Sequence, residues 1–237
     1  MFISASRNRE LSEFSEKINV PFLIVGLLNT VFTHPSHTQE KKESYERLEF
    51  LGDAVLKLIV SNYFFKKYNK ELEGVLTEKR NSVISDETLA KLAQKLDFEE
   101  LILMSEDMKN SSYSKDIVLA CVFEALLGGI FLEAGYERAE KFFLDNFKEE
   151  IDEIASMARA SNYKAVLQEY TQSIDATLPE YNLTAETGKS HNKTFTYEVV
   201  WQNNVLGEGS GKTKKQAQTL AAKCAIEKLK EEGAKIW

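Results

Sequence analysis

Cysteine and histidine are scarce in this chain, which holds 2 cysteines and 3 histidines among its 237 residues. Cys121 and Cys224 lie far apart, and no second pair accompanies them to form a zinc site or a disulfide framework. The histidines are His34, His37 and His191, and no serine–histidine–aspartate arrangement is evident among them. A low cysteine content without a disulfide framework is typical of proteins in a reducing compartment. We therefore expect a cytoplasmic protein.

Long apolar runs are missing as well. No run approaches the roughly 18 consecutive apolar residues that span a bilayer. Residues 1–10 are polar and lack the apolar segment of a signal peptide. We therefore expect no membrane partner. Hydrophobic residues still make up 43% of the chain, which is enough for a packed core, and the length fits one or two domains.

The chain also has no surplus of basic residues. Its formal net charge is −7, which by itself argues against a nucleic-acid partner. The acid is unevenly spread, because residues 161–237 hold 10 lysines against 9 acidic residues, whereas residues 1–160 hold 20 basic against 28 acidic residues. Phosphate is recognised by a local basic patch, so the overall charge does not exclude RNA.

The apolar spacing predicts that residues 1 to about 155 are almost entirely helical. Helices are expected over residues 23–31, 44–68, 76–96 (one or two helices, capped at Ser85 or Asp86), 117–134 and 139–158. Breaks are expected at residues 33–36, at the Glu73–Gly74 pair and at Gly135, a favourable residue for ending a helix.

The pattern changes after residue 160. A short helix is expected over residues 163–172, followed by strands over 179–186, 193–201 and 205–209, with a tight turn at Asn203–Asn204. Thr213 can cap a last helix. The predicted fold class is therefore α+β, with an all-helical domain over residues 1–158 and a small α-β-β-β-α domain over residues 161–232.

Three acids occupy one face of the helix expected over residues 44–68. Glu46, Glu49 and Asp53 stand at i, i+3 and i+7 and lie within about 60° of one another. Like charges so placed repel, and most of the remaining helix is apolar. A solvated face and a site for a hard cation such as Mg²⁺, which prefers carboxylate oxygens, both fit this spacing.

The same segment resembles a known family. Residues 46–56 read ERLEFLGDAVL, and this uninterrupted string resembles the signature of the ribonuclease III family. Residues 27–36 and the C-terminal domain resemble the family too. The resemblance implies an endonuclease that hydrolyses double-stranded RNA with Mg²⁺, or Mn²⁺ as a substitute, and processes ribosomal and other RNA precursors. It also implies 5′-phosphate and 3′-hydroxyl ends with short 3′ overhangs.

Site residues follow from the resemblance by position. Glu49 and Asp53 match metal-site carboxylates of the signature helix, and Glu124 matches a glutamate of a second helix that ligates the metal. The resemblance makes Asp53 and Glu124 the catalytic residues, with Glu46 as a supporting acid. Cys121 departs from the pattern, because the family has aspartate at this position.

Two interpretations of Cys121 are open. A thiol is mostly neutral at pH 7 and is a softer ligand than Mg²⁺ prefers, so Cys121 is either a small buried residue or, less favoured, a direct ligand. Asp116 cannot replace the missing acid in a regular helix, because it lies eight residues from Glu124, roughly 12 Å along the axis. The alternative function is accordingly a double-stranded-RNA-binding protein with a weakened catalytic site. A plain helical scaffold would leave the second domain unexplained.

The resemblance further implies a homodimer in which each subunit cuts one strand. Phe50 matches an aromatic residue at the family's subunit contact, and Gly128–Gly129 would allow helices to approach closely. His34 is expected to be a structural helix-end residue rather than a general base, and Glu73 a solvated loop acid.

The C-terminal domain resembles the double-stranded-RNA-binding fold. Gln168 on its first helix and His191 in its first hairpin loop match residues that enter two minor grooves. The start of its last helix matches the segment that meets phosphates of the major groove, through Lys212, Lys214 and Lys215. Cations crowd a helix N-terminus unfavourably unless an anion arrives there, which independently supports RNA binding that reads shape rather than sequence.

Overall fold

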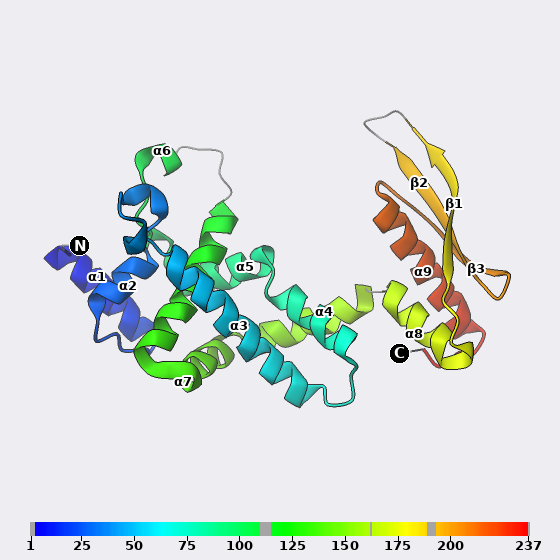
Figure 1. Ribbon diagram of the computed structural model, residues 1–237, viewed down its shortest axis with the longest axis horizontal. Coiled ribbons are helices and arrows are strands. Elements are labelled where there is room, and N and C mark those ends of the chain that lie inside the picture. The colour runs from blue at the N-terminus through cyan, green and yellow to red at the C-terminus, as the bar shows by residue number, and fades with distance from the viewer. Residues whose placement is uncertain (1–2, 110–114, 162, 189–192, 237) are drawn as a thin grey trace. The chain divides into compact units, whose positions relative to one another are not determined.

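The computed structural model describes residues 3–109, 115–161, 163–188 and 193–236, with only the backbone described over 158–161. The chain divides into two compact units, Met1–Ser156 and Met157–Trp237. The first is helical and the second carries a three-stranded sheet, so the predicted α+β class is confirmed (Figure 1).

The helical unit consists of α-helices joined by loops and short 3₁₀ turns. Its elements are α1 (Ala5–Lys17), α2 (Val25–Val31), the 3₁₀ turns η1 (Pro35–His37) and η2 (Lys41–Glu43), α3 (Glu46–Lys67), α4 (Glu73–Val83), α5 (Asp86–Leu96), η3 (Glu99–Leu101), α6 (Glu106–Lys109) and α7 (Lys115–Ser161).

The predicted helices of this unit are present, with two corrections at their ends. Leu23 precedes α2 and is exposed, so it does not belong to the apolar stripe of that helix. The expected break at Glu73–Gly74 is instead the first turn of α4, where Glu73 accepts a hydrogen bond from the Thr77 hydroxyl. Ser85 caps α5 by accepting from the Thr88 N–H, as one of the two predicted caps.

Helix α7 is kinked at Gly135. This glycine has φ +82° and ψ 179°, a conformation that side chains rarely adopt, and it interrupts the helix where the sequence predicts a helix end. The part of α7 between Lys115 and Met157 is long and apolar enough to cross a membrane by composition alone. However, its apolar side chains are mostly buried in the helical unit, which is typical of a core helix.

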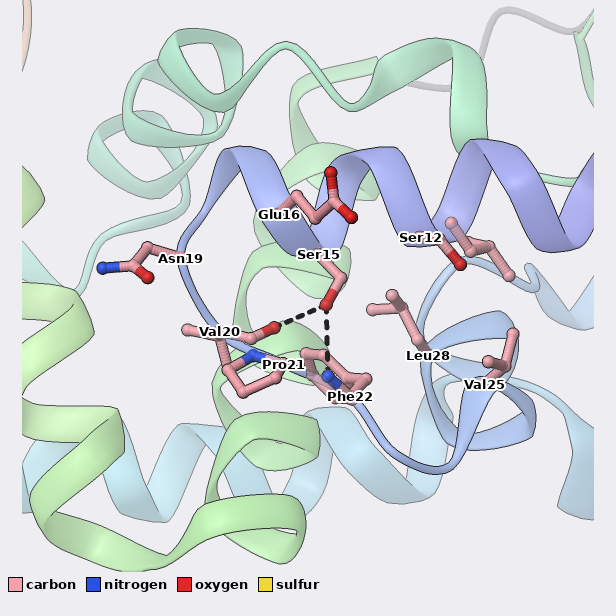
Figure 2. Close-up of a pocket in the computed structure, with 10 residues that line it drawn as sticks. Ser12, Ser15, Glu16, Asn19, Val20, Pro21, Phe22, Val25 and Leu28 are labelled. Carbon is pink, nitrogen blue, oxygen red and sulfur yellow. Dashed lines mark hydrogen bonds between the residues drawn. The ribbon is translucent and has the colours of Figure 1, made fainter.

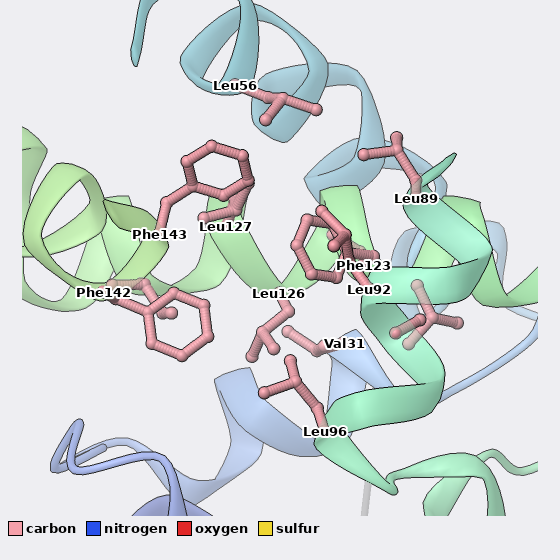
Figure 3. Packing of buried hydrophobic residues seen from close by; sticks show 14 of the residues in the cluster. Val31, Leu56, Leu89, Leu92, Leu96, Phe123, Leu126, Leu127, Phe142 and Phe143 are labelled. Atoms are coloured by element: carbon pink, nitrogen blue, oxygen red, sulfur yellow. The ribbon is translucent and has the colours of Figure 1, made fainter. Parts of the chain in front are cut away.

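The core of the helical unit joins helices that are distant in the sequence. Figure 3 shows Leu56 of α3, Leu89 of α5 and Phe123 of α7 around a common centre, and all three side chains are fully buried. Burial of one such side chain contributes about 1.5–3 kcal/mol to stability. The packing therefore fixes α3, α5 and α7 beside one another.

A pocket of about 460 Å³ lies between α1 and α2 (Figure 2). At its wall the Ser15 hydroxyl donates to the carbonyl of Val20 at 2.6 Å and accepts from the N–H of Phe22 at 3.1 Å. These bonds fix the turn that places Phe22 against α7 at Gly129. Of the acids predicted to form the site, none lines this pocket, and we assign it no chemical role.

The second unit has the predicted α-β-β-β-α order. Its elements are α8 (Tyr163–Asp175), β1 (Glu180–Thr187), β2 (Thr194–Trp201), β3 (Asn204–Gly211) and α9 (Lys214–Glu231). The strands form an antiparallel sheet in the order β1-β2-β3.

The turn between β2 and β3 lies one residue earlier than predicted. Trp201 pairs with Asn204, so Gln202 and Asn203 form the turn, and both have positive φ. Asparagine tolerates this conformation better than most residues, and with Asn203 at the second turn position Asn204 becomes free to pair in the sheet.

Helix α9 lies in direct contact with β3. A Cβ atom at Gly207 would come within 2.5 Å of the backbone nitrogen of Ala225, which shows how closely helix and strand approach. The facing side of α9 is correspondingly small and fully buried, with Ala217, Ala221, Ala222 and Ala225. Thr213 caps α9 by accepting from the Gln216 N–H, as predicted.

Candidate active site and nucleic-acid interface

Helices α3 and α7 cross with their backbones in contact. A methyl group at Gly52 would overlap the carbonyl oxygen of Glu124 and lie 2.5 Å from its carbonyl carbon. Gly128 approaches Leu48 in the same way. Because Gly52 lies between Glu49 and Asp53 on α3, this crossing brings their carboxylates to the segment of α7 that carries Glu124.

The three predicted carboxylates Glu49, Asp53 and Glu124, here called the acidic cluster, are partly buried and act on one another electrostatically. Burial, and then the charges of Asp53 and Glu49, raise the pKa of Glu124 to about 7. Burial also raises the pKa of Glu49, although a hydrogen bond from Cys121 opposes this shift. The structure thus brings the predicted acids together with negative charge in excess.

Cys121 faces the acidic cluster, one turn before Glu124. Burial and the neighbouring carboxylate of Glu49 raise the pKa of its thiol to about 12, so the thiol is neutral and donates a hydrogen bond to Glu49. A neutral thiol of this kind is a poor ligand for a hard cation. In this structure Cys121 therefore acts as a hydrogen-bond donor to Glu49.

The charge of Asp86 also acts on this site, although the sequence indicated no such role for it. Asp86 is the first residue of α5, and its negative charge raises the pKa of Glu49, Cys121 and Glu124. The sequence identified it only as a possible helix cap. Its spacing to the other acids carries no signal, because it lies on a third helix.

The fit of a cation to this site depends on its donor set. Among the described residues, no three histidine, cysteine, aspartate or glutamate side chains lie close enough together to hold a metal ion directly. Asp53 instead forms an ion pair with Lys57 at 2.7 Å. Neighbouring carboxylates with excess negative charge are nevertheless suited to a hard cation, and Mg²⁺ needs few protein ligands because it retains water. The residues therefore fit a divalent cation that would compete with Lys57.

The other predicted residues of the helical unit lie at the edge of this site. Glu46 is exposed and accepts a hydrogen bond from Ser44 at 3.3 Å. The ring nitrogen Nδ1 of His34 accepts from the Ser36 N–H at 3.0 Å, and its ring packs edge-on against Tyr45. Burial lowers the pKa of His34. Because its side chain caps the N-terminus of η1, His34 is a structural helix-end residue, as expected.

Phe50 projects from α3 into solvent and is 82% exposed. Leu132 of α7 is exposed nearby and lines the same hollow of about 690 Å³ as Phe50. Leu23 and Ile24 are exposed as well, and the carboxylate of Glu133 on α7 accepts their backbone N–H groups. We call Phe50 and Leu132, with the hollow that they line, the apolar face.

The close helix approach expected at Gly128–Gly129 is present, and it occurs within the chain. Gly128 faces α3 of the same chain, and a Cβ at Gly129 would lie 2.9 Å from the side chain of Val31. Both glycines are therefore used in packing within the chain.

The predicted RNA-facing side chains of the second unit are exposed. Gln168 lies on α8, and the three lysines lie at the N-terminus of α9. Lys212 donates from its side chain to Thr194 at 3.3 Å, and the Lys214 ammonium lies 5.9 Å from the centre of the Phe195 ring. Lys215 stands in the same first turn. His191 lies outside the described residues.

Comparisons with known proteins agree with the division into a helical unit and a second unit with a sheet. A family model described as ribonuclease-III-like matches residues 25–151, and one described as a double-stranded RNA binding motif matches residues 163–229. The chain is 34% identical to a ribonuclease 3 from Borreliella burgdorferi over 227 residues, covering 94% of this chain and 93% of the relative. It is 38% identical to a ribonuclease 3 from Bacillus cereus over 224 residues, covering 92% and 91%.

A solved structure is similar to the helical unit. The nuclease domain of a ribonuclease III from Campylobacter jejuni is 35% identical, with a TM-score of 0.55, and the match covers 59% of this chain and 96% of that domain. That structure is described as flexible in a region involved in dimer formation.

Proposed function

The chain belongs to the ribonuclease III family of nucleases that act on double-stranded RNA, and from this premise we propose a specific activity. It hydrolyses phosphodiester bonds of duplex RNA with a divalent cation, Mg²⁺ or Mn²⁺, and leaves 5′-phosphate and 3′-hydroxyl ends. Duplex stems of ribosomal and messenger RNA precursors are the substrates of this proposal. The observation that carries it is the crossing at Gly52, which gathers the acidic cluster in a chain that also has an RNA-binding unit.

The acidic cluster would hold the cation. A divalent ion there supplies a Lewis acid for the phosphate and lowers the pKa of a nearby water. Glu49 and Asp53 contribute negative charge from α3, and Asp53 would exchange its pairing with Lys57 for the cation. Glu124, with a pKa of about 7, can accept or release a proton near neutral pH, and a bound cation would favour its charged form.

The second unit would hold the duplex. Gln168 and the exposed lysines Lys212, Lys214 and Lys215 are suited to the minor groove and to phosphates, and His191 is proposed for a second minor groove. The charge of the lysines at the N-terminus of α9 is unfavourable without an anion, so phosphate binding stabilises this end of the helix.

A homodimer completes the proposal. The hollow beside Phe50 lies on the same face as Phe50 itself, so two copies related by a two-fold axis can each insert a side chain into the other. The apolar face would then be covered. The two sites of such a dimer can address the two strands of one duplex.

One experiment with two variants tests binding and cutting separately. Duplex binding is measured by fluorescence anisotropy in EDTA over a salt series, and cleavage is measured in Mg²⁺ on end-labelled RNA. Glu124→Gln should bind the duplex as the wild type does and lose at least about a hundredfold in cleavage rate, a loss of the size that follows when a catalytic carboxylate is removed. Lys214→Ala should weaken binding and flatten the slope of log affinity against log salt by about 1.

The same measurements distinguish the proposed nuclease activity from the alternative function. A wild-type protein that binds duplex RNA but does not cut it at any Mg²⁺ or Mn²⁺ concentration would be the RNA-binding protein with a weakened site. If Glu124→Gln cut as fast as the wild type, the assignment of the acidic cluster would be wrong. An unchanged salt slope in Lys214→Ala would remove that lysine from the interface.

A further inference from the structure

A hollow of about 600 Å³ lies between α3 and α4, two helices that pack against each other (Figure 1). Its lining is largely apolar and includes Leu58, Phe65 and Leu76, of which Leu58 and Phe65 are exposed. Of the described residues that line this hollow, Arg80 of α4 is the only basic one. The hollow therefore presents a single positive charge in apolar surroundings.

The guanidinium of Arg80 is held in place without being neutralised. Its Nη1 atom donates to the Ser61 hydroxyl of α3 at 3.2 Å. Its Nε atom is buried and has no hydrogen-bond partner, and no described carboxylate forms an ion pair with this residue. Arg7, by contrast, is paired with Glu10 at 3.5 Å. A charge in apolar surroundings is unfavourable unless it is paired, so an anion that enters the hollow would stabilise Arg80.

Two polar neighbours of Arg80 in this hollow have other partners. The carboxylate of Glu73 accepts a hydrogen bond from the Thr77 hydroxyl at 2.8 Å, and Glu73 is exposed, so solvent screens its charge. The Asn62 amide donates to the carboxylate of Glu140 on α7 at 2.7 Å. An incoming anion would therefore interact mainly with the guanidinium.

Helix α3 connects the hollow to the acidic cluster. Asp53, Lys57 and Ser61 follow one another at intervals of four residues, which places them along one side of the helix. Ser61, the partner of Arg80, stands roughly 12 Å along the helix axis from Asp53. Lys57 lies between them, is half exposed and pairs with Asp53 at 2.7 Å. Positive groups therefore continue along α3 from the acidic cluster to the hollow.

We propose that Arg80 binds a backbone phosphate of the duplex RNA, next to the phosphodiester that the acidic cluster addresses. A guanidinium presents a planar fork of donors that matches phosphate oxygens, and the apolar lining strengthens the contact by excluding water. The helical unit carries an excess of acid, so its approach to RNA requires local positive charge of this kind. This inference rests on the proposed function and adds a contact on the helical unit to those of the second unit.

The test measures duplex RNA binding to the full chain by fluorescence anisotropy in EDTA over a salt series. Arg80→Gln should weaken binding about tenfold and lower the slope of log affinity against log salt by about 1. Ser61→Asp leaves Arg80 in place but gives it a carboxylate partner, and it should have the same effect. Lys66→Gln is the control, because it removes a positive charge from the opposite side of α3, and it should stay within about twofold of the wild type.

Further variants distinguish an RNA contact from a structural role. Arg80→Lys retains the charge and should keep the salt slope of the wild type. Arg80→Gln combined with Lys214→Ala should lower the slope by about 2, because the two contacts lie in separate units. In cleavage assays with Mg²⁺, Arg80→Gln should raise KM about tenfold and leave kcat within about threefold of the wild type.

Each result decides the inference. Wild-type affinity in Arg80→Gln and Ser61→Asp, or an equal loss in Lys66→Gln, would overturn it, as would a reduced slope in Arg80→Lys. A wild type that sediments as a dimer while Arg80→Gln sediments as a monomer would make the hollow a subunit contact and also overturn it. Thermal melts in EDTA check folding, and Ser61→Asp decides the matter if Arg80→Gln does not fold. The proposed function fails separately, through a wild type that does not cut duplex RNA.

Discussion

In the absence of a cation, the negative charges of the acidic cluster act unfavourably on one another. Glu124 is partly buried and faces two carboxylates of α3 and one of α5, so its charged form is disfavoured and its pKa lies at about 7. Lys57 offsets part of this charge and lowers the pKa of Glu124. Single residues at this site therefore couple folding stability to proton and cation concentration.

The stability of the metal-free protein should fall as pH rises from about 4.5 to about 7. The folded state binds a proton at Glu124 in this range that the unfolded state has already released, so raising the pH favours unfolding. Glu124→Gln removes this group and should flatten the decline of the thermal midpoint. The measurement is a series of melts in EDTA between pH 5 and pH 8.

A control variant tests whether the change in pH dependence is specific to Glu124. Glu149→Gln removes an exposed acid of α7 and should leave the pH dependence as it is in the wild type. Identical pH slopes for Glu124→Gln and the wild type would contradict the electrostatic description of the cluster. Mg²⁺ should oppose the decline in the wild type, because it stabilises the charged carboxylates.

At the scale of elements, the crossing of α3 and α7 decides where the acids meet. Two glycines allow the backbones to touch, and each stands near an acid of the cluster: Gly52 between Glu49 and Asp53, and Gly128 one turn after Glu124. Any side chain at these positions would push the two helices apart and separate the carboxylates.

Gly52→Ala should therefore destabilise the protein by on the order of 3 kcal/mol and impair cleavage, because its methyl group overlaps backbone atoms rather than a side chain that could turn away. Gly74→Ala is the matched control. Gly74 lies in α4 with open space around its Cβ position, so alanine should stabilise the helix by about 0.5–1 kcal/mol. Urea unfolding of both variants checks the prediction, and equal midpoints would refute it.

Over the whole molecule, the proposed homodimer would cover the apolar face. Phe50 and Leu132 are large, exposed and adjacent to one hollow, and exposed apolar patches of this kind mark interaction sites. In the proposed dimer, Phe50 of each copy would enter the hollow of the other, because projection and hollow lie on the same face.

Phe50→Glu should convert a dimer into a monomer, because a carboxylate would be buried without a partner at the contact. Sedimentation velocity should show the 27.0 kDa mass of one chain for this variant and twice that mass for the wild type. Leu178→Glu, which adds the same charge at an exposed apolar residue of the second unit, should remain dimeric. A dimer that survives Phe50→Glu would rule out the apolar face as the contact.

Much of this protein follows from local sequence alone. Helical spacing places Glu49 and Asp53 on one face, and the order of helix and strand patterns predicts the second unit. Thr213 caps the start of α9, and Gly135 interrupts α7. Such features depend on neighbours within a few residues, so periodicity and capping chemistry are sufficient to predict them. The predicted position of the turn at Gln202–Asn203 was wrong by one residue, because the pairing of β2 with β3 determines which residues form the turn.

Only the tertiary structure decided which residues surround Glu124. The use of Gly128 within the chain, the pairing of Lys57 with Asp53, the hydrogen bond from Cys121 to Glu49 and the approach of Asp86 all depend on how α3, α5 and α7 pack. That packing is set by buried contacts such as those of Leu89 and Phe123, which are separated by more than thirty residues. Spacing along the chain holds no information about such contacts, and for this reason the charge at position 86 became visible only in the folded molecule.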